Sequence, residues 1–176
     1  MSRVFCIPGI LFLLCAFVLS FLVSISLPFL PALDIARVHF RDGNALVDGR
    51  TVTETRFGIW APCSYETDGS RICEGSGHGY HVSISNTDKD SSTNIGSGWT
   101  RGLAVHPVAT AVTFIAFLLS FSTHVSVTLI SSLVSFLAAL LTFIAFIIDI
   151  ALFAFVHHEA GNVNDVGANV NTAPGT

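Results

Sequence analysis

The chain has 176 residues, of which 51% are hydrophobic and only 11% are charged, and its mean hydropathy is +0.68. A soluble domain of this size carries about 25% charged residues, so the composition excludes an ordinary soluble domain. The formal net charge is −4 and no basic patch is present, which argues against a nucleic-acid partner. The charge deficit is local: 4–33 carries no charged residue, and 103–156 carries only Asp149. These apolar runs predict an integral membrane protein.

The first apolar run is much longer than the core of a signal peptide, and no clean small-x-small cleavage site follows it. Pro28 and Pro31 interrupt its end. We therefore predict a retained first transmembrane span over residues 4–27, with a cleaved signal peptide as the alternative.

Residues 34–101 form the main polar region and predict a small β-domain. The segments 51–57 and 80–85 are rich in β-branched or alternating residues and read as strands. Residues 86–98 are rich in polar residues and are expected to form a mobile loop. A domain this small needs a disulfide or support from the spans to be stable.

Two cysteines, Cys63 and Cys73, lie in this polar region and would close a short disulfide if the region is extracytoplasmic. The alternative is a metal site that also uses His78 and His81. The spacing C-x9-C with H-x2-H is not a common zinc pattern, so the sequence favours the disulfide and no metal.

Two further spans are predicted over residues 103–121 and 127–156. The apolar run that contains the last span begins at Val125 and would form a helix about 48 Å long, which exceeds the hydrocarbon core of about 30 Å. This helix must tilt or protrude into a soluble part. Residues 157–176 show no periodicity and are expected to be a flexible tail or the start of a second outer loop.

The orientation of the chain receives conflicting signals. Seven of the eight Lys and Arg residues lie in 37–101, which a count of positive charges would place in the cytoplasm. That rule weakens for loops longer than about 60 residues. The whole polar region, residues 34–101, carries nine acidic residues and the cysteine pair, which favour the outside. We expect an outer loop and a cytoplasmic N-terminus.

The element Gly58-Ile59-Trp60-x-x-Cys63…Cys73 between the first two spans resembles the G-L-W-x-x-C…C signature of claudin-like tetraspan proteins. The resemblance to fungal PalI-family pH-response regulators is closer. It is carried by Leu27-Pro28-Phe29-Leu30, by 57–73, by His106-Pro107, by 132–139 and by 146–153.

This resemblance implies a mainly α, integral membrane fold: a claudin-like helical bundle with a small extracellular β-domain. It also implies a plasma-membrane protein that assists a larger multi-span, seven-helix sensor of ambient pH. The family has four spans and often a long cytoplasmic tail, whereas three spans are found here. The sequence is therefore expected to be either a fragment or a shortened version.

Candidate chemistry is sparse. Asp149 lies deep in an apolar run. It is either a proton-responsive or helix-pairing carboxylate within the membrane, or a residue that lies outside the hydrocarbon near the end of an overlong helix. The histidines His78, His81 and His106, with His39, carry side chains that titrate between pH 5 and 8. No P-loop, nucleophile elbow or nucleophile–base pair is present, so we expect no enzyme, no cofactor and no small-molecule substrate.

The sequence thus predicts a non-enzymatic accessory protein of fungal ambient-pH signalling, whose partners are membrane lipid and a larger sensor. The alternative is a protein that organises membrane domains at the cell cortex. A third possibility, a small channel, would use Asp149, but three spans from one chain make a poor pore.

Overall fold

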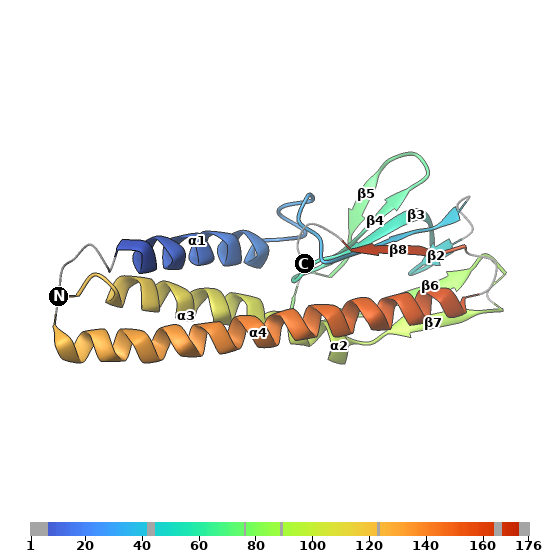
Figure 1. Cartoon of the computed structure of the whole chain (residues 1–176). Coiled ribbons are helices and arrows are strands. Elements are labelled where there is room, and N and C mark those ends of the chain that lie inside the picture. Colours follow the sequence, from blue (N-terminus) through green and yellow to red (C-terminus); the bar gives the residue numbers. More distant parts are fainter. Residues whose placement is uncertain are drawn as a thin grey trace. The chain divides into compact units, whose positions relative to one another are not determined.

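The computed structural model describes residues 7–41, 45–75, 77–88, 90–122, 124–163 and 167–172. These residues fall into a helical unit, formed by 1–24 and 105–146, and a sheet unit, formed by 25–104 and 147–176. Within the described ranges, three helical segments are long and apolar enough to cross a membrane: Ile7–Ser24, Ser97–Leu119 and Val125–Asn162. The elements are labelled in Figure 1.

The helical unit contains α1 (Ile7–Ser24), α3 (Val105–Leu119) and the first part of α4 (Val125–Asn162). Small side chains line the buried face of α3, namely Ala109, Thr110, Thr113 and Ala116. Such side chains let neighbouring backbones approach closely, which is how helices associate where no hydrophobic effect drives them together. The rings of Phe17 and Phe114 lie 5.0 Å apart and add contact between α1 and α3.

Hydroxyl groups on these helices are satisfied locally, as an apolar environment requires. The Thr110 and Thr113 hydroxyls donate to carbonyls one turn earlier, at 2.9 and 2.8 Å, and the Ser20 and Thr110 hydroxyls lie 2.6 Å apart across α1 and α3. The Ser131 hydroxyl of α4 lies 3.5 Å from the Ala116 carbonyl oxygen. The large apolar side chains instead point outward, where acyl chains can cover them. On α4 of this unit they are Val125, Leu129, Ile130, Leu133, Phe136, Leu137, Leu140, Phe143, Ile144 and Phe146.

The sheet unit is built on one antiparallel sheet with the order β5-β4-β3-β2-β6-β7. The strand β3 is the longest, and its second edge is shared by β2 over Arg50–Val52 and by β1 over Glu54–Phe57. The strand β8 pairs with the other edge of β1. The bounds are β1 Ala36–His39, β2 Ala45–Val47, β3 Arg50–Phe57, β4 Pro62–Glu66, β5 Arg71–Cys73, β6 Val82–Asn86, β7 Ser92–Ile95 and β8 Asn169–Thr172.

The sheet is larger than the two strands that the sequence predicts. The expected strands at 51–57 and 80–85 correspond to β3 and β6, but two other expectations are wrong. Residues 92–95 form β7 instead of lying in a mobile loop, because Thr93 and Ile95 are buried there. Residues 169–172 form β8 instead of a flexible tail, because their backbone pairs with β1. Residues 4–6 of the expected first span, and 164–166 and 173–176 of the expected tail, lie outside the described residues.

The second part of α4, from Ile147, belongs to the sheet unit. Its buried residues recur at helical spacing and include Asp149, Leu152, Val156 and Ala160. Phe155 on the same helix stacks on Trp99 of α2 (Ser97–Arg101), with ring centroids 4.3 Å apart. The last part of the overlong helix predicted from the sequence therefore packs within the sheet unit. The helix runs to Asn162, beyond the expected end at 156.

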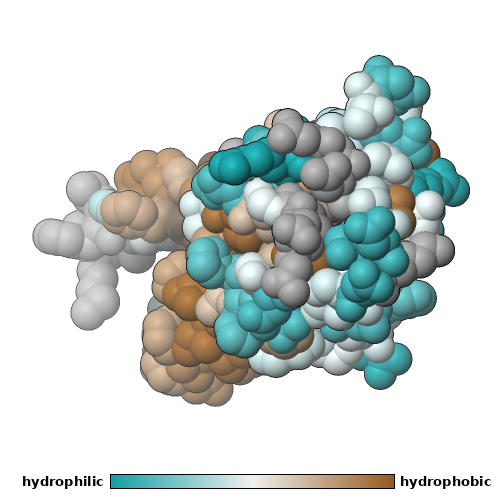
Figure 2. Space-filling model, turned by 90° about the vertical axis from the view of Figure 1, so that its right-hand side faces the viewer, coloured by the Kyte–Doolittle hydropathy of each residue, from teal (hydrophilic) through white to brown (hydrophobic). Residues whose placement is uncertain are grey.

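The face of the sheet unit that is turned toward the viewer in Figure 2 is mainly polar. Figure 2 shows teal and white residues covering the face of this unit that is turned toward the viewer. Polar outward faces and apolar inward faces alternate along the strands; β1, for example, buries Ala36 and Val38 while Arg37 and His39 remain half-exposed. This alternation is typical of an antiparallel sheet with one face toward water.

Candidate functional site

The turn Gly58–Ala61, which we call the signature turn, joins β3 to β4 and is held from several sides. Its own ends are joined by the Gly58 N–H, which donates to the Ala61 carbonyl at 3.3 Å. The Ile59 N–H donates to the Ser26 hydroxyl oxygen at 3.0 Å. The Gly77 N–H donates to the Trp60 carbonyl at 2.9 Å. The backbone of the turn is thus fixed by segments that precede and follow it in the chain.

Gly58 is required by close packing and not by its backbone angles. A Cβ at this position would lie 2.4 Å from Cβ of Leu27 and 3.1 Å from the Leu27 backbone. Leu27 itself is fully buried. The segment after α1 therefore lies directly against the signature turn, and only a residue without a side chain fits between them.

Tyr80 anchors the turn from the opposite side. Its hydroxyl donates to the Gly58 carbonyl at 2.7 Å, and its own carbonyl accepts from the Thr100 hydroxyl at 2.7 Å. Burial raises the pKa of Tyr80 well above its ordinary value, because the phenolate would have to form in a dry site. Tyr80 therefore remains a neutral donor throughout the physiological range of pH.

The disulfide between Cys63 and Cys73 is present, as the cysteine spacing predicts. The two residues lie directly opposite each other on β4 and β5, and Cys63 is fully buried. Both sulfurs are used by this bond, so the metal site considered for the pair is wrong. The hairpin between them turns at Asp68, whose carboxylate accepts from the Ser70 N–H at 2.8 Å. This hydrogen bond lowers the pKa of Asp68.

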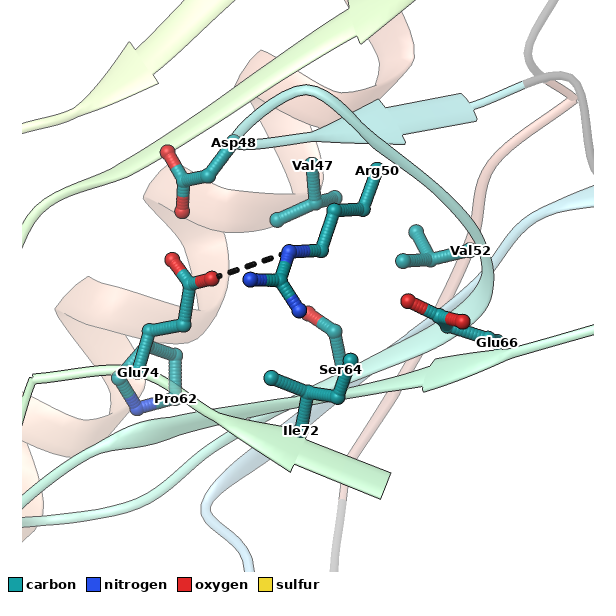
Figure 3. A pocket seen from close by; sticks show the side chains of 9 residues that line it. All are labelled: Val47, Asp48, Arg50, Val52, Pro62, Ser64, Glu66, Ile72 and Glu74. Carbon is teal, nitrogen blue, oxygen red and sulfur yellow. Dashed lines mark ion pairs between the residues drawn. The ribbon is translucent and has the colours of Figure 1, made fainter. Parts of the chain in front are cut away.

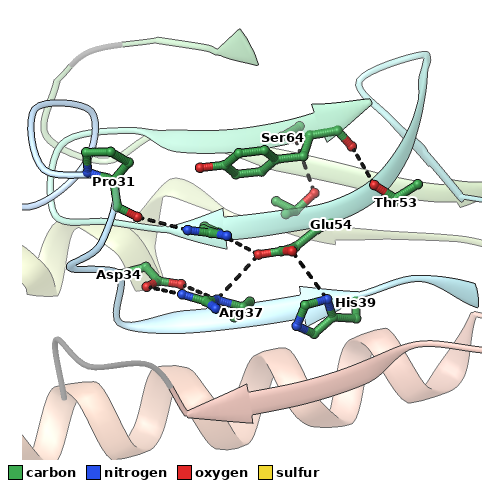
Figure 4. Close-up of polar contacts among 10 residues, drawn as sticks. Pro31, Asp34, Arg37, His39, Thr53, Glu54 and Ser64 are labelled. Carbon is green, nitrogen blue, oxygen red and sulfur yellow. Dashed lines mark hydrogen bonds and ion pairs between the residues drawn. The ribbon is translucent and has the colours of Figure 1, made fainter. Parts of the chain in front are cut away.

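A network of charged groups covers the outer face of β1 and β3 (Figure 4). Glu54 is its centre: it accepts from Arg56 Nε, and it lies 3.4 Å from both Arg37 Nε and His39 Nδ1. Arg37 also makes two hydrogen bonds of 2.9 Å to the fully buried carboxylate of Asp34. That hydrogen bonding raises the pKa of Arg37. The network joins the neighbouring strands β1 and β3 through paired charges.

The described part of the sheet unit carries a narrow hollow and a wider one. The narrower one, shown in Figure 3, holds about 10 Å³ between Val47, Val52 and Ile72 and is bridged by the Arg50–Glu74 ion pair at 3.4 Å. That volume suits about one water molecule. The wider one is open and holds about 480 Å³; it is lined by Asp48, Glu74, Gly75, Gly77, His78, Gly79, Tyr80 and His81. Enclosed apolar pockets of the kind that bind small ligands are not among these features.

The predicted site residues do not converge on one place. His78 and His81 are exposed beside the wider hollow, whereas His106 is buried on α3. Asp149 is buried on the part of α4 that belongs to the sheet unit, at 3% exposure. The proton-responsive or helix-pairing role of these residues stays a prediction. In the described part of the chain, no group of three or more His, Cys, Asp or Glu side chains is placed to hold a metal ion.

Sequence reasoning did not single out several residues that hold the signature turn. Ser26 and Tyr80 act over separations of 33 and 22 residues, and no local pattern marks either of them. Glu54 lies in a run of alternating polar residues, and alternation alone does not reveal which of them shares a face with Arg37 and His39. Only the register of β1 against β3 brings them together.

Comparison with known proteins gives one match. A model of the SUR7/PalI family matches residues 5–176, which is nearly the whole chain. No curated protein and no solved structure matches. The match agrees with the resemblance carried by the signature turn and the cysteine pair. The chain therefore belongs to the SUR7/PalI family of membrane proteins.

Proposed function

We propose that this protein is a non-enzymatic accessory subunit of ambient-pH sensing at the fungal plasma membrane. The observation that carries the proposal is the family match over residues 5–176. In this proposal the protein binds a larger multi-span pH sensor and stabilises or localises it. The wider hollow is open rather than enclosed, and the charges of the Glu54 network are paired with one another, which supports a binding role over a catalytic one.

The proposed architecture is a claudin-like bundle with an extracellular sheet domain. The sheet follows the first apolar helix in the chain, and the position of the signature turn and the disulfide between the first two apolar helices supports this architecture. A disulfide in a small domain supports an oxidising compartment, hence an outer sheet domain and a cytoplasmic N-terminus. The polar outer surface of the sheet unit is suited to that setting (Figure 2).

The proposed topology predicts how the two cysteines react in intact cells. A membrane-impermeant maleimide is expected to label Cys63 and Cys73 from outside only after treatment with a reductant, because the native pair has no free thiol. Cys6 and Cys15, which lie in the first apolar run, are replaced by serine to remove their background. Labelling that requires permeabilisation and no reductant would show that the topology is inverted.

The proposed partner predicts a physical complex and a phenotype. Immunoprecipitation of the tagged protein from detergent extracts is expected to recover a seven-span membrane sensor, and cells without the protein are expected to lose the response to alkaline medium. A matched control is a protein with the same tag and Gly58→Ala, whose sheet domain is destabilised. Localisation to punctate cortical patches, with no sensor recovered and a normal pH response, would instead favour a membrane-domain organiser.

A further inference from the structure

The indole of Trp60 and the imidazole of His78 form a ring contact at the signature turn. Their centroids lie 4.9 Å apart and their planes are inclined by 51°. Trp60 is half-buried and His78 is exposed, so His78 can exchange protons with solvent. Next to this contact, the Gly77 N–H donates to the Trp60 carbonyl. The ring contact and this hydrogen bond join the segment 77–80 to the signature turn.

The segment 77–80 is otherwise irregular up to Tyr80. Gly79 has a φ of +79°, a conformation that favours glycine. A Cβ on Gly79 would lie 2.4 Å from Cγ of Arg101, so the Arg101 side chain lies across this segment. Tyr80 then fixes the far end through its hydrogen bond to Gly58. The ring contact therefore restrains the one stretch between two fixed points, Trp60 and Tyr80.

Both acidic and basic side chains lie in the surroundings of His78. Asp48 of the β2–β3 turn and Glu74 line the same open hollow as His78. Arg50 offsets part of the field of Glu74, with which it pairs at 3.4 Å, and Arg101 across Gly79 is the opposing cation. His81 and the neutral Tyr80 complete the lining. Both signs of charge are therefore present around His78, and the indole of Trp60 is its aromatic neighbour.

We propose that Trp60 and His78 form a pH-dependent contact, which we call the clasp. The clasp is closed when the two rings are in contact and open when they are apart. A protonated imidazole in contact with an indole ring gains a cation–π attraction that the neutral imidazole lacks. Histidine gains its proton in the range of pH 5 to 8. Acidification thus fastens the segment 77–80 to the signature turn, and neutral or alkaline conditions loosen it. At an exposed site the attraction changes the ratio of closed to open clasp by about 2- to 5-fold.

In the proposed function, the clasp is the part of the protein that responds to pH. Its role in signalling therefore rests on the proposed function. A looser segment at alkaline pH would change the shape of the open hollow, beside Asp48 and Glu74, that a partner meets. Its proton response, however, is a property of the purified chain and is measured without any partner.

The test is a fluorescence titration of the purified full chain in detergent. Trp99→Phe leaves Trp60 as the remaining tryptophan and keeps an aromatic ring against Phe155. Imidazolium quenches indole emission by contact, so emission is expected to fall on acidification with a midpoint between pH 5 and 8. His78→Gln is expected to abolish this transition. His81→Gln removes an exposed histidine from the same hollow and is expected to retain it.

Amide hydrogen exchange provides a second measurement. After correction for intrinsic rates, Gly79 and Tyr80 amides are expected to exchange about 2- to 5-fold more slowly at pH 5.5 than at pH 8, and His78→Gln should remove this difference. A titration that persists in His78→Gln, or that is lost in His81→Gln, overturns the clasp. A normal clasp titration together with an intact pH response in cells that lack the protein overturns the proposed function and leaves the clasp standing.

Discussion

Replacing Cys63 by serine is expected to lower the free energy of unfolding of the sheet unit by about 3 kcal/mol. The disulfide closes a loop of sequence separation 10 and so restricts the unfolded chain. Cys63 is also fully buried, so a serine hydroxyl would enter a dry site. Chemical denaturation of the detergent-purified protein, followed by the emission of Trp60 and Trp99, measures the change.

The matched control is Cys15→Ser, which replaces a free cysteine on α1 and should leave the denaturation of the sheet unit unchanged. Reductant applied to the unaltered protein should reproduce most of the loss seen in Cys63→Ser. Equal midpoints with and without reductant would show that this bond contributes nothing to stability.

Gly58→Ala is expected to cost about 3 kcal/mol, at the upper end of what overpacking costs. The new methyl group would lie 2.4 Å from Cβ of Leu27, and the Leu27 backbone lies only 3.1 Å away, so the strain cannot be relieved by rotating one flexible side chain. A backbone shift that relieves this contact would also displace the Gly58 carbonyl, which accepts from the Tyr80 hydroxyl. Thermal unfolding of the purified protein, compared with the unaltered chain, measures the effect.

Gly96→Ala is the control for this experiment. Gly96 lies in the same unit, has a φ of −74°, and a Cβ there would meet nothing within 4 Å. Its stability should stay within about 0.5 kcal/mol of the parent, as is usual for surface substitutions. If Gly58→Ala were as stable as Gly96→Ala, the close approach of Leu27 to the signature turn would be wrong.

The sequence predicts well those elements whose cause is local. The three apolar helices follow from composition alone, and β3 follows from the β-branched run at Thr51–Thr55. By contrast, β7 and β8 are short and polar, and their strand conformation comes from partners elsewhere. β7 pairs with β6, and its Thr93 hydroxyl donates to Glu159 on α4. β8 contains two asparagines, which are rare in strands, and it depends on the free edge of β1.

The sequence likewise predicts some parts of the candidate site and not others. The signature residues Gly58, Ile59 and Trp60 and the cysteine pair are contiguous or nearly so, and the family pattern identifies them. The contact between Trp60 and His78 cannot be predicted from the sequence, because it depends on how the segment after β5 folds back. His39 likewise gains a partner only through the register of β1 against Glu54.

The position of β8 has a consequence for biosynthesis. β1 and β3 can pair early, but the second edge of β1 waits for Asn169–Thr172, which the ribosome makes some 130 residues after His39. At 5–20 residues per second this interval is roughly 7–26 s. During this interval α3 and then α4 are made and inserted, while β1 offers a row of unpaired backbone amides and carbonyls to any neighbour. Nascent chains are therefore most exposed to chaperones, and to mispairing with one another, at the strand that follows their first membrane helix.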